Sequence, residues 1–235
     1  MSIRQNQLGQ PIGEPVADWR PPPVPPRQAI DGRYCRLEPL DASRHASDLF
    51  RANRADVEGR IWTYLAYGPF DSETEYRDWA RQCSESVDPL FFAVIDASSR
   101  TARGVLSYLR IDPPGGAIEV GHICYAPALQ RTPAATEAVY LLMREAFAMG
   151  YRRFEWKCDA LNAPSRAAAL RYGLTFEGIF RQATVYKGRN RDTAWYSAID
   201  SEWPRLDAAF TRWLDPSNFD ASGKQRMSLK TLTLG

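Results

Sequence analysis

Two side chains able to accept a proton lie close together in the middle of the chain. Glu119 and His122 both fall within the mostly apolar segment 118–125, which Pro127 ends. A carboxylate or an imidazole can serve as a general base, and the ordinary pKa of histidine suits a base near neutral pH. Strict alternation along a strand places the two on opposite faces unless a β-bulge intervenes, and either residue could instead be structural.

A helix start follows this segment. Thr132 suits the N-cap position and Pro133 the first helical position, and the helix is expected to continue with one apolar face as far as Gly150. The first N–H groups of a helix have no partner within it, and the helix dipole favours negative charge there. Together with the donors of Gln130 and Arg131, this start predicts a binding site for an anion such as a pyrophosphate.

A second strand and a second helix complete a βαβα run. Residues 154–158 are expected to form the strand, and residues 164–172 an Ala- and Arg-rich helix that Gly173 ends. Asn162 and Ser165 stand at the start of that helix. A side chain at such a position either caps the helix or faces a ligand.

The run resembles the GNAT N-acetyltransferase superfamily, and within it the Rim-type branch of protein N-terminal acetyltransferases. The phosphate loop of the family reads Gln/Arg-x-x-Gly-x-Gly/Ala, and residues 130–135 match it except that Pro133 replaces the first glycine. Glu-Val-Gly-His at 119–122, Asn-Ala-Pro-Ser at 162–165 and Tyr-Gly-Leu at 172–174 match the same branch. The resemblance covers residues 34–203.

The resemblance implies an enzyme that transfers acetyl from acetyl-CoA to a primary amine by direct attack in a ternary complex, without a metal. Proline has no N–H, so Pro133 removes one donor to the phosphates, whereas the next three residues keep theirs. The residues expected to bind acetyl-CoA are Cys124, Tyr125, Gln130, Arg131, Thr132, Ala134, Ala135, Thr136, Asn162 and Ser165.

The same resemblance assigns catalytic roles. An α-amine, with a pKa near 7.7 to 8.0, is partly neutral at physiological pH and needs only a modest base. Glu119 is the first candidate for that base, because the family often places a carboxylate there, and His122 is the second. Many relatives protonate the departing thiolate with a tyrosine seven residues after the asparagine, where this chain has Ala169. In the Rim-type branch a serine at the position of Ser165 can fill that role.

Four aromatic residues lie where the family has its acceptor-specificity segment: Trp62, Tyr64, Tyr67 and Phe70. Such a cluster can line a ligand site, although aromatic residues at this density more often form core. The expected acceptor is a protein N-terminal α-amine or a small aminoacyl-type molecule. The alternatives are a non-catalytic module that senses acyl-CoA and an unrelated interaction domain that uses a proline-rich arm.

Composition excludes several other classes of function. Thirty basic residues against 28 acidic ones give a net charge of +2, which argues against nucleic acid or a membrane surface as the main partner. The four cysteines have neither metal-site nor disulfide spacing, so no metal is expected. Neither a signal peptide nor a membrane-spanning segment is predicted, so we expect a cytoplasmic protein. Dimers are common among proteins of the family, so a homodimer is a further expectation.

Three parts are expected along the 235 residues. Residues 1–29 form a proline-rich arm, which Trp19 could anchor, residues 30–205 form the acetyltransferase domain, and residues 206–235 hold a helix end and a polar surface tail. The order of elements predicts one α+β domain with a mixed, mostly antiparallel central sheet flanked by helices. Strands are expected at 34–38, 90–95, 104–110, 118–125, 154–158, 175–186 and 194–199, helices at 41–54, 72–85, 132–150, 164–172 and 201–213, and turns at 113–116 and 187–191.

Overall fold

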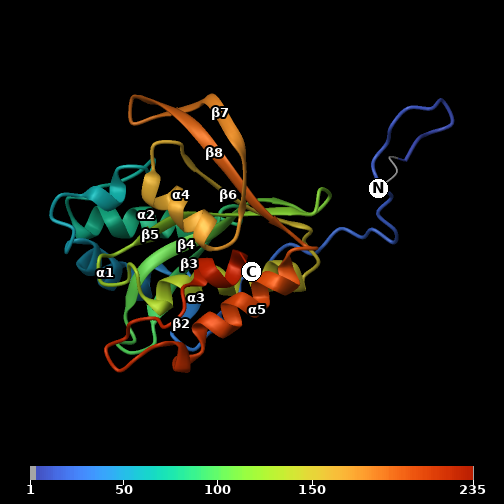
Figure 1. The fold of residues 1–235 in the computed structure, drawn as a ribbon. Coiled ribbons are helices and arrows are strands. Elements are labelled where there is room, and N and C mark those ends of the chain that lie inside the picture. The colour runs from blue at the N-terminus through green and yellow to red at the C-terminus, as the bar shows by residue number, and fades with distance from the viewer. Residues whose placement is uncertain (1–3, 235) are drawn as a thin grey trace.

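A single eight-stranded sheet organises the computed structural model, which describes residues 4–234 (Figure 1). The strand order is β1-β2-β3-β4-β5-β6-β8-β7, and only β5 and β6 pair in parallel. The strands are β1 (Ile30–Asp31), β2 (Cys35–Pro39), β3 (Leu90–Asp96), β4 (Ala102–Asp112), β5 (Ala117–Tyr125), β6 (Arg153–Asp159), β7 (Thr175–Tyr186) and β8 (Arg189–Ile199). The expected mixed, mostly antiparallel α+β fold is confirmed.

Six α-helices accompany the sheet in the described residues. They are α1 (Ala42–Asn53), α2 (Glu73–Glu85), α3 (Pro133–Ala148), α4 (Ala163–Arg171), α5 (Trp203–Leu214) and α6 (Leu229–Leu234). Side chains cap the starts of the first four. Asp41 caps α1, Ser72 caps α2, Thr132 caps α3 and Asn162 caps α4. No described helix has the length and apolarity that a membrane crossing requires.

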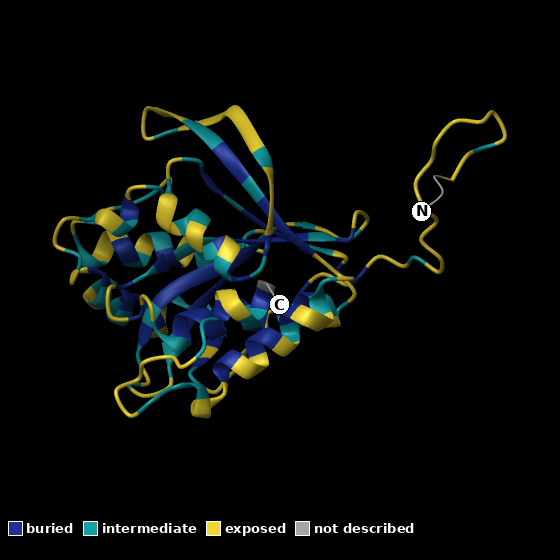
Figure 2. Cartoon of the chain, in the orientation of Figure 1, coloured by how far each residue is buried: buried dark blue, intermediate teal, exposed yellow. Residues whose placement is uncertain are grey.

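The sheet carries a hydrophobic core on each face. Leu90, Phe92 and Val94 of β3 belong to the core that also contains α3 and α5, whereas Phe91 and Ala93 belong to the core that contains α1 and α2. The alternation follows from the two-residue period of a strand. Figure 2 shows the central strands buried, while the β7–β8 hairpin extends from the body with β7 almost wholly exposed. We call the two sides the α3 face and the α1–α2 face.

A β-bulge changes the alternation within β5. Ile118 and Val120 point to the α3 face, but beyond the bulge Cys124 lies in the core of the α1–α2 face. The register with β4 shifts there, and His122 has a left-handed backbone with φ of +51°. Glu119 and His122 therefore share the α1–α2 face, so the placement on opposite faces that strict alternation predicted is wrong.

The parallel pair separates soon after it begins. β5 and β6 are in register only from the pair Ala117 with Arg153 to the pair Val120 with Trp156. β6 remains paired with β8 as far as Asp159, and β5 remains paired with β4 as far as Tyr125. Beyond these pairs the two strands are no longer hydrogen-bonded to each other, and we call the place where they diverge the β5–β6 gap.

Three other expectations need correction. The hairpin turn is tighter than expected, because β8 begins at Arg189 and residues 189–191 pair with β7. Their polar side chains are compatible with a strand because this hairpin lies in solvent. The C-terminal segment is more than a surface tail, since Leu229 is fully buried in the core of the α3 face. Helix α5 spans residue 205, where the acetyltransferase domain was expected to end.

Glu137 of α3 is a buried carboxylate with a structural role. It accepts hydrogen bonds from the backbone N–H groups of Arg33, Tyr34 and Cys35, at 2.8, 2.6 and 2.8 Å. Gly32 leaves room for it, because an added Cβ would lie 2.5 Å from Glu137 Oε2. The contact fixes the turn between β1 and β2 against the second turn of α3.

We predict that Glu137→Ala lowers the free energy of unfolding by about 3 kcal/mol, since three backbone N–H groups, one buried and two part-buried, lose their acceptor. Urea denaturation followed by circular dichroism measures this. Glu145→Ala on the same helix is the control, because the side chain of Glu145 is 38% exposed and pairs with Arg144 at the surface. Equal decreases in the free energy of unfolding for the two variants would contradict the structural role of Glu137.

Candidate active site

The start of α3 presents an unpartnered backbone donor. Thr132 Oγ1 accepts the N–H of Ala135 at 3.1 Å and donates to the carbonyl of Leu129 at 2.7 Å. Pro133 occupies the first helical position, where its missing N–H costs least. Among the described residues the N–H of Ala134 has no hydrogen-bond partner. The helix start is therefore capped but still able to bind an anion.

A shallow cavity of about 370 Å³ borders this helix start. Thr132, Pro133 and Ala134 form one wall, and Arg33 with Tyr34 and residues 96–98 form the rest. The helix start thus borders an open cavity, with Thr132 and Pro133 partly exposed and Ala134 4% exposed. Gln130 is exposed, but its Nε2 donates to the carbonyl of Tyr125 at 2.8 Å, so it joins the end of β5 to the loop before α3.

Helix α4 lies against the other side of the helix start. Arg171 Nη2 donates to Thr136 Oγ1 at 2.9 Å, which ties the last turn of α4 to the first turn of α3. No local pattern distinguishes Arg171 from Arg166, the other arginine of that helix. At the other end of α4, Asn162 Oδ1 accepts the N–H of Ser165 at 3.1 Å, so Asn162 is a cap as well as a candidate ligand residue.

Ser165 lies beside the gap on the α3 face. Its Oγ accepts the indole N–H of Trp156 at 2.9 Å, and Trp156 is the last residue of β6 paired with β5. The carboxylate of Glu119 lies on the opposite face of the same strands. A proton acceptor and a hydroxyl thus flank the β5–β6 gap from its two faces.

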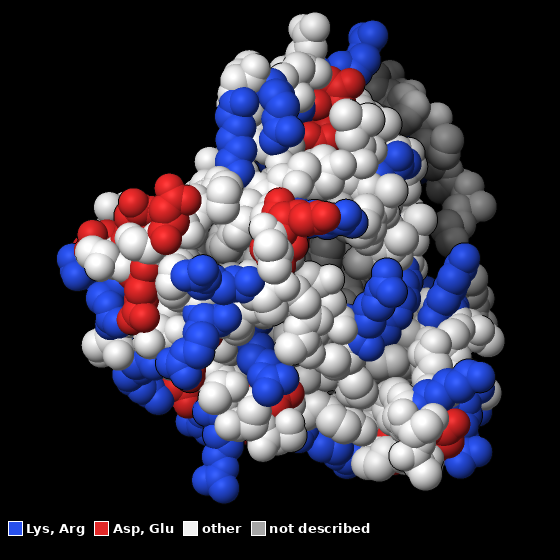
Figure 3. All heavy atoms as spheres, turned by 90° about the vertical axis from the view of Figure 1, so that its left-hand side faces the viewer, with Lys and Arg blue, Asp and Glu red and all other residues white. Residues whose placement is uncertain are grey.

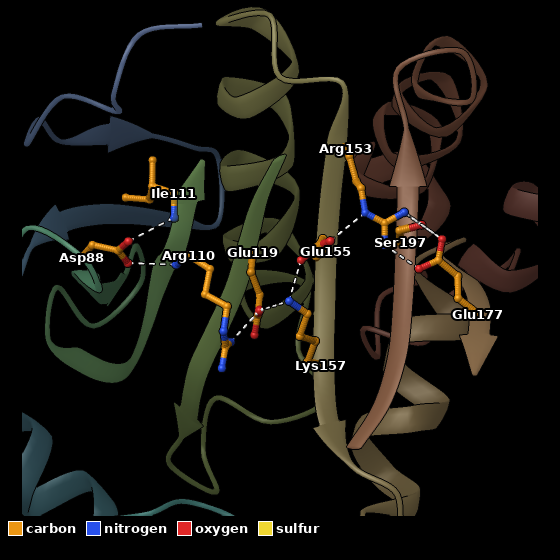
Figure 4. Close-up of polar contacts among 9 residues, drawn as sticks. All are labelled: Asp88, Arg110, Ile111, Glu119, Arg153, Glu155, Lys157, Glu177 and Ser197. Atoms are coloured by element: carbon orange, nitrogen blue, oxygen red, sulfur yellow. Dashed lines mark hydrogen bonds and ion pairs between the residues drawn. The ribbon is translucent and has the colours of Figure 1, made fainter. Parts of the chain in front are cut away.

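Glu119 is held by two cations (Figure 4). Its Oε2 lies 2.6 Å from Arg110 Nη1 and 3.0 Å from Lys157 Nζ, and its side chain is only 3% exposed. Burial raises the pKa of Glu119, and the charges of Lys157 and Arg110 oppose that rise. Sequence reasoning missed both cations, because only the register of β4, β5 and β6 brings them to Glu119.

His122 packs against aromatic rings and is not placed to act as a base. Its ring stacks on Tyr67 with centroids 5.7 Å apart and an interplanar angle of 15°, and it lies 5.0 Å from the ring of Phe91. Burial lowers the pKa of His122 to about 4, and Arg110 and Arg191 add to the effect by repulsion. The ring is therefore neutral at neutral pH, with little affinity for a proton.

The aromatic segment divides into core and surface. Trp62 packs edge-on against Tyr67 and Phe70, with centroids 6.3 and 5.4 Å away, and all three belong to the α1–α2 face. Tyr64 instead donates from its hydroxyl to the carbonyl of Leu161 at 3.2 Å, across to the loop before α4. The structure thus supports a core role for three of the four aromatic residues.

The β7–β8 hairpin also reaches this segment. Lys187 Nζ donates to the carbonyl of Trp62 and Arg189 to that of Thr63, both at 2.8 Å. Figure 3 shows the side of the molecule that lies at the left in Figure 1, where basic and acidic side chains are interspersed. Three parts of the chain therefore meet here: the segment between α1 and α2, the hairpin tip and the start of α4.

Comparison with known proteins identifies the class. The model of the GNAT acetyltransferase domain matches residues 35–175. A GCN5-related N-acetyltransferase from Brucella melitensis is 48% identical, with 94% of this chain and 100% of that chain covered and a TM-score of 0.92. A GNAT-family protein from Chromobacterium violaceum is 45% identical, with 83% and 98% covered and a TM-score of 0.77. A search of curated proteins finds no match.

A more distant likeness concerns the fold alone. The RimL ribosomal L7/L12 alpha-N-protein acetyltransferase is 23% identical, with 75% of this chain and 99% of that chain covered and a TM-score of 0.63.

The family model and the two structures above 40% identity agree on the class of protein. The chain belongs to the GNAT acetyltransferase family and is an N-acetyltransferase. This confirms the superfamily that the sequence motifs indicated, and it does not favour the non-catalytic sensor. Residues 4–234 contain no group of three or more His, Cys, Asp or Glu side chains placed to hold a metal ion.

We predict that the imidazole of His122 titrates near pH 4 in proton NMR, with His45→Gln used to assign the two histidine signals. Because the folded pKa lies below the unfolded value near 6.5, the stability that the neutral ring contributes is present above pH 6.5 and is lost as the pH falls towards 4. A titration midpoint at 6.5 or above would show that the ring is not buried as described.

Proposed function

We propose that the enzyme transfers acetyl from acetyl-CoA to a primary amine by direct attack within a ternary complex. The single observation that carries this proposal is the β5–β6 gap, which lies between the open start of α3 and the carboxylate of Glu119. A thioester in the gap would have a diphosphate site at one end and a proton acceptor at the other. No covalent enzyme intermediate is needed, because the amine is itself the nucleophile.

The residues around the gap fit acetyl-CoA. The free N–H of Ala134, the loop residues Gln130 and Arg131 and the following turn of α3 would bind the diphosphate. The edge of β5 beyond Val120, which has no strand partner, would hydrogen-bond the pantetheine chain near Cys124 and Tyr125, although Gln130 already holds the Tyr125 carbonyl. Asn162 would contact the chain from α4. A backbone N–H of β5 would also hold the carbonyl oxygen as it gains negative charge.

The two faces of the gap supply the proton transfers. The neutral amine attacks the thioester carbon, and Glu119 takes the proton that the nitrogen then loses. The carbon–sulfur bond breaks as the carbonyl reforms, and the hydroxyl of Ser165 gives its proton to the thiolate. Ser165 then regains a proton from water. His122 packs the bulge and takes no part, since its affinity for a proton is low.

The acceptor we propose is an α-amine, either of a protein N-terminus, as in the Rim-type branch, or of a small aminoacyl compound. An α-amine is already partly neutral near pH 7, which suits a carboxylate base better than a lysine side chain would. Tyr64 contacts the loop that follows β6, and the hairpin tip contacts the segment just before Tyr64. An acceptor that approached from this side would meet Tyr64, the aromatic residue free of the core.

We predict that Ala134→Pro raises the KM for acetyl-CoA about tenfold and leaves kcat within about threefold, because one donor to the diphosphate is lost, worth about 1.4 kcal/mol. Release of the free thiol measures both constants. The control substrate is S-acetyl-N-acetylcysteamine, a thioester without a diphosphate, for which the variant and the wild type should not differ. A tenfold rise in KM for both substrates would show that the diphosphate does not bind at the N–H of Ala134.

We predict that Glu119→Gln lowers the rate of acetylation of an N-terminal peptide amine by about 10²-fold at pH 7 and by clearly less at pH 9, where hydroxide can take the proton that the nitrogen loses. Glu155→Gln is the matched control, because its carboxylate also contacts Lys157 but has both oxygens occupied by cations, Oε1 by Arg153 and Oε2 by Lys157. A change within about fivefold is expected. Mass spectrometry of the acetylated peptide is the measurement. A loss that is the same at both pH values would exclude Glu119 as the base.

A further inference from the structure

Lys157 is a buried cation at the point where β5 and β6 separate. Its side chain is 6% exposed, and its Nζ lies 3.0 Å from Glu119 Oε2 and 2.7 Å from Glu155 Oε2. The ring of Trp195, on β8, has its centroid 3.7 Å from the same nitrogen. A buried charge persists only with such partners. Here they come from three neighbouring strands.

The ion pair orients the carboxylate of Glu119. Both cations bind Oε2, and Oε1 has no hydrogen bond from any described residue. Oε1 lies on the side of Gly121, where an ideal Cβ would come within 3.6 Å of it. Gly121 is the first residue of β5 beyond the paired segment, so the unbonded oxygen is directed to the β5–β6 gap.

The charges around Glu119 differ greatly in exposure. Arg110, on β4, is 60% exposed, so water screens its effect. Glu155, on β6, is the nearest other carboxylate, and Arg153 neutralises it at 2.6 Å. His122, on β5 itself, is neutral near pH 7. Lys157 is therefore the one buried cation among the described residues that faces Glu119, and its field is screened least.

We propose that Lys157 is a positioning residue of the transferase, which keeps the Glu119 carboxylate ionised and its Oε1 turned to the gap. This rests on the proposed function, in which Glu119 is the base. A buried carboxyl without a cation binds a proton more readily, and a protonated acid cannot accept the proton of the amine. Lys157 would thus set the lowest pH at which the enzyme works.

The first experiment measures the ionisation of Glu119 without turnover. Carboxyl carbon NMR titrations of the wild type, Lys157→Met and Arg110→Gln are compared, and Glu119→Gln identifies the signal. The midpoint should rise by at least one pH unit in Lys157→Met and by clearly less in Arg110→Gln, whose charge is screened. Equal midpoints in the wild type and Lys157→Met would overturn the proposal.

The second experiment follows kcat and KM against pH with a peptide α-amine. Lys157→Met should lose at least tenfold in kcat at pH 6.5, and the loss should shrink as the pH rises, with the KM for acetyl-CoA unchanged. Lys157→Arg should recover most of the rate because it restores a cation. A loss independent of pH indicates a merely structural role and overturns the proposal.

The two readouts separate this proposal from the proposed function. If neither the wild type nor any variant acetylates an amine, the proposed function is wrong. The NMR midpoints still decide whether Lys157 controls the ionisation of Glu119. If Lys157→Met does not fold, as urea denaturation would show, Lys157→Gln takes its place in both experiments. Glutamine is uncharged but can still hydrogen-bond both carboxylates, so the same rise in midpoint is expected.

Discussion

The early end of the ladder between β5 and β6 is the constraint on which the rest of the site depends. Each strand keeps its other neighbour, β4 or β8, so the sheet remains continuous while one internal edge of β5 is left unpaired. Unpaired backbone groups inside a protein need partners, and a ligand with amide groups can supply them. The bulge at His122 bends β5 at this place, and the ion pair between Glu119 and Lys157 crosses the strands where they separate.

Two buried glutamates, Glu137 and Glu119, show how the hydrogen-bond partners of a carboxylate determine its role. Glu137 accepts hydrogen bonds from three backbone N–H groups through both of its carboxylate oxygens, and backbone N–H groups do not titrate. Glu137 therefore fixes the fold. Glu119 is held through one oxygen by two side-chain cations, and its other oxygen is left free next to the gap. A buried ion pair adds little to stability once desolvation is counted. Its use here is to orient a carboxylate and to set its charge.

Much of the frame could be predicted because its signals are local. The cap at Thr132 and the proline after it are read from neighbouring residues, as is the helix that follows Asn162, and the structure has helices at both places. The element order likewise predicted the single crossover that makes β5 and β6 parallel. The site was predicted less completely. Lys157 lies 38 positions after Glu119 in the chain, and Arg171 lies 35 after Thr136, so no local pattern joins either pair.

The sequence by itself determined the capped helix start at Thr132, the family and the α+β sheet, because capping and strand periodicity depend on residues close in the chain. Only the tertiary structure decided which face each side chain takes beyond the bulge, because a single extra residue inverts the alternation of all that follow. It also decided that His122 is packed as a neutral ring and that Glu119 is paired with Lys157. Burial and the distance between charges on different strands control both protonation states, and neither is a property of the sequence alone.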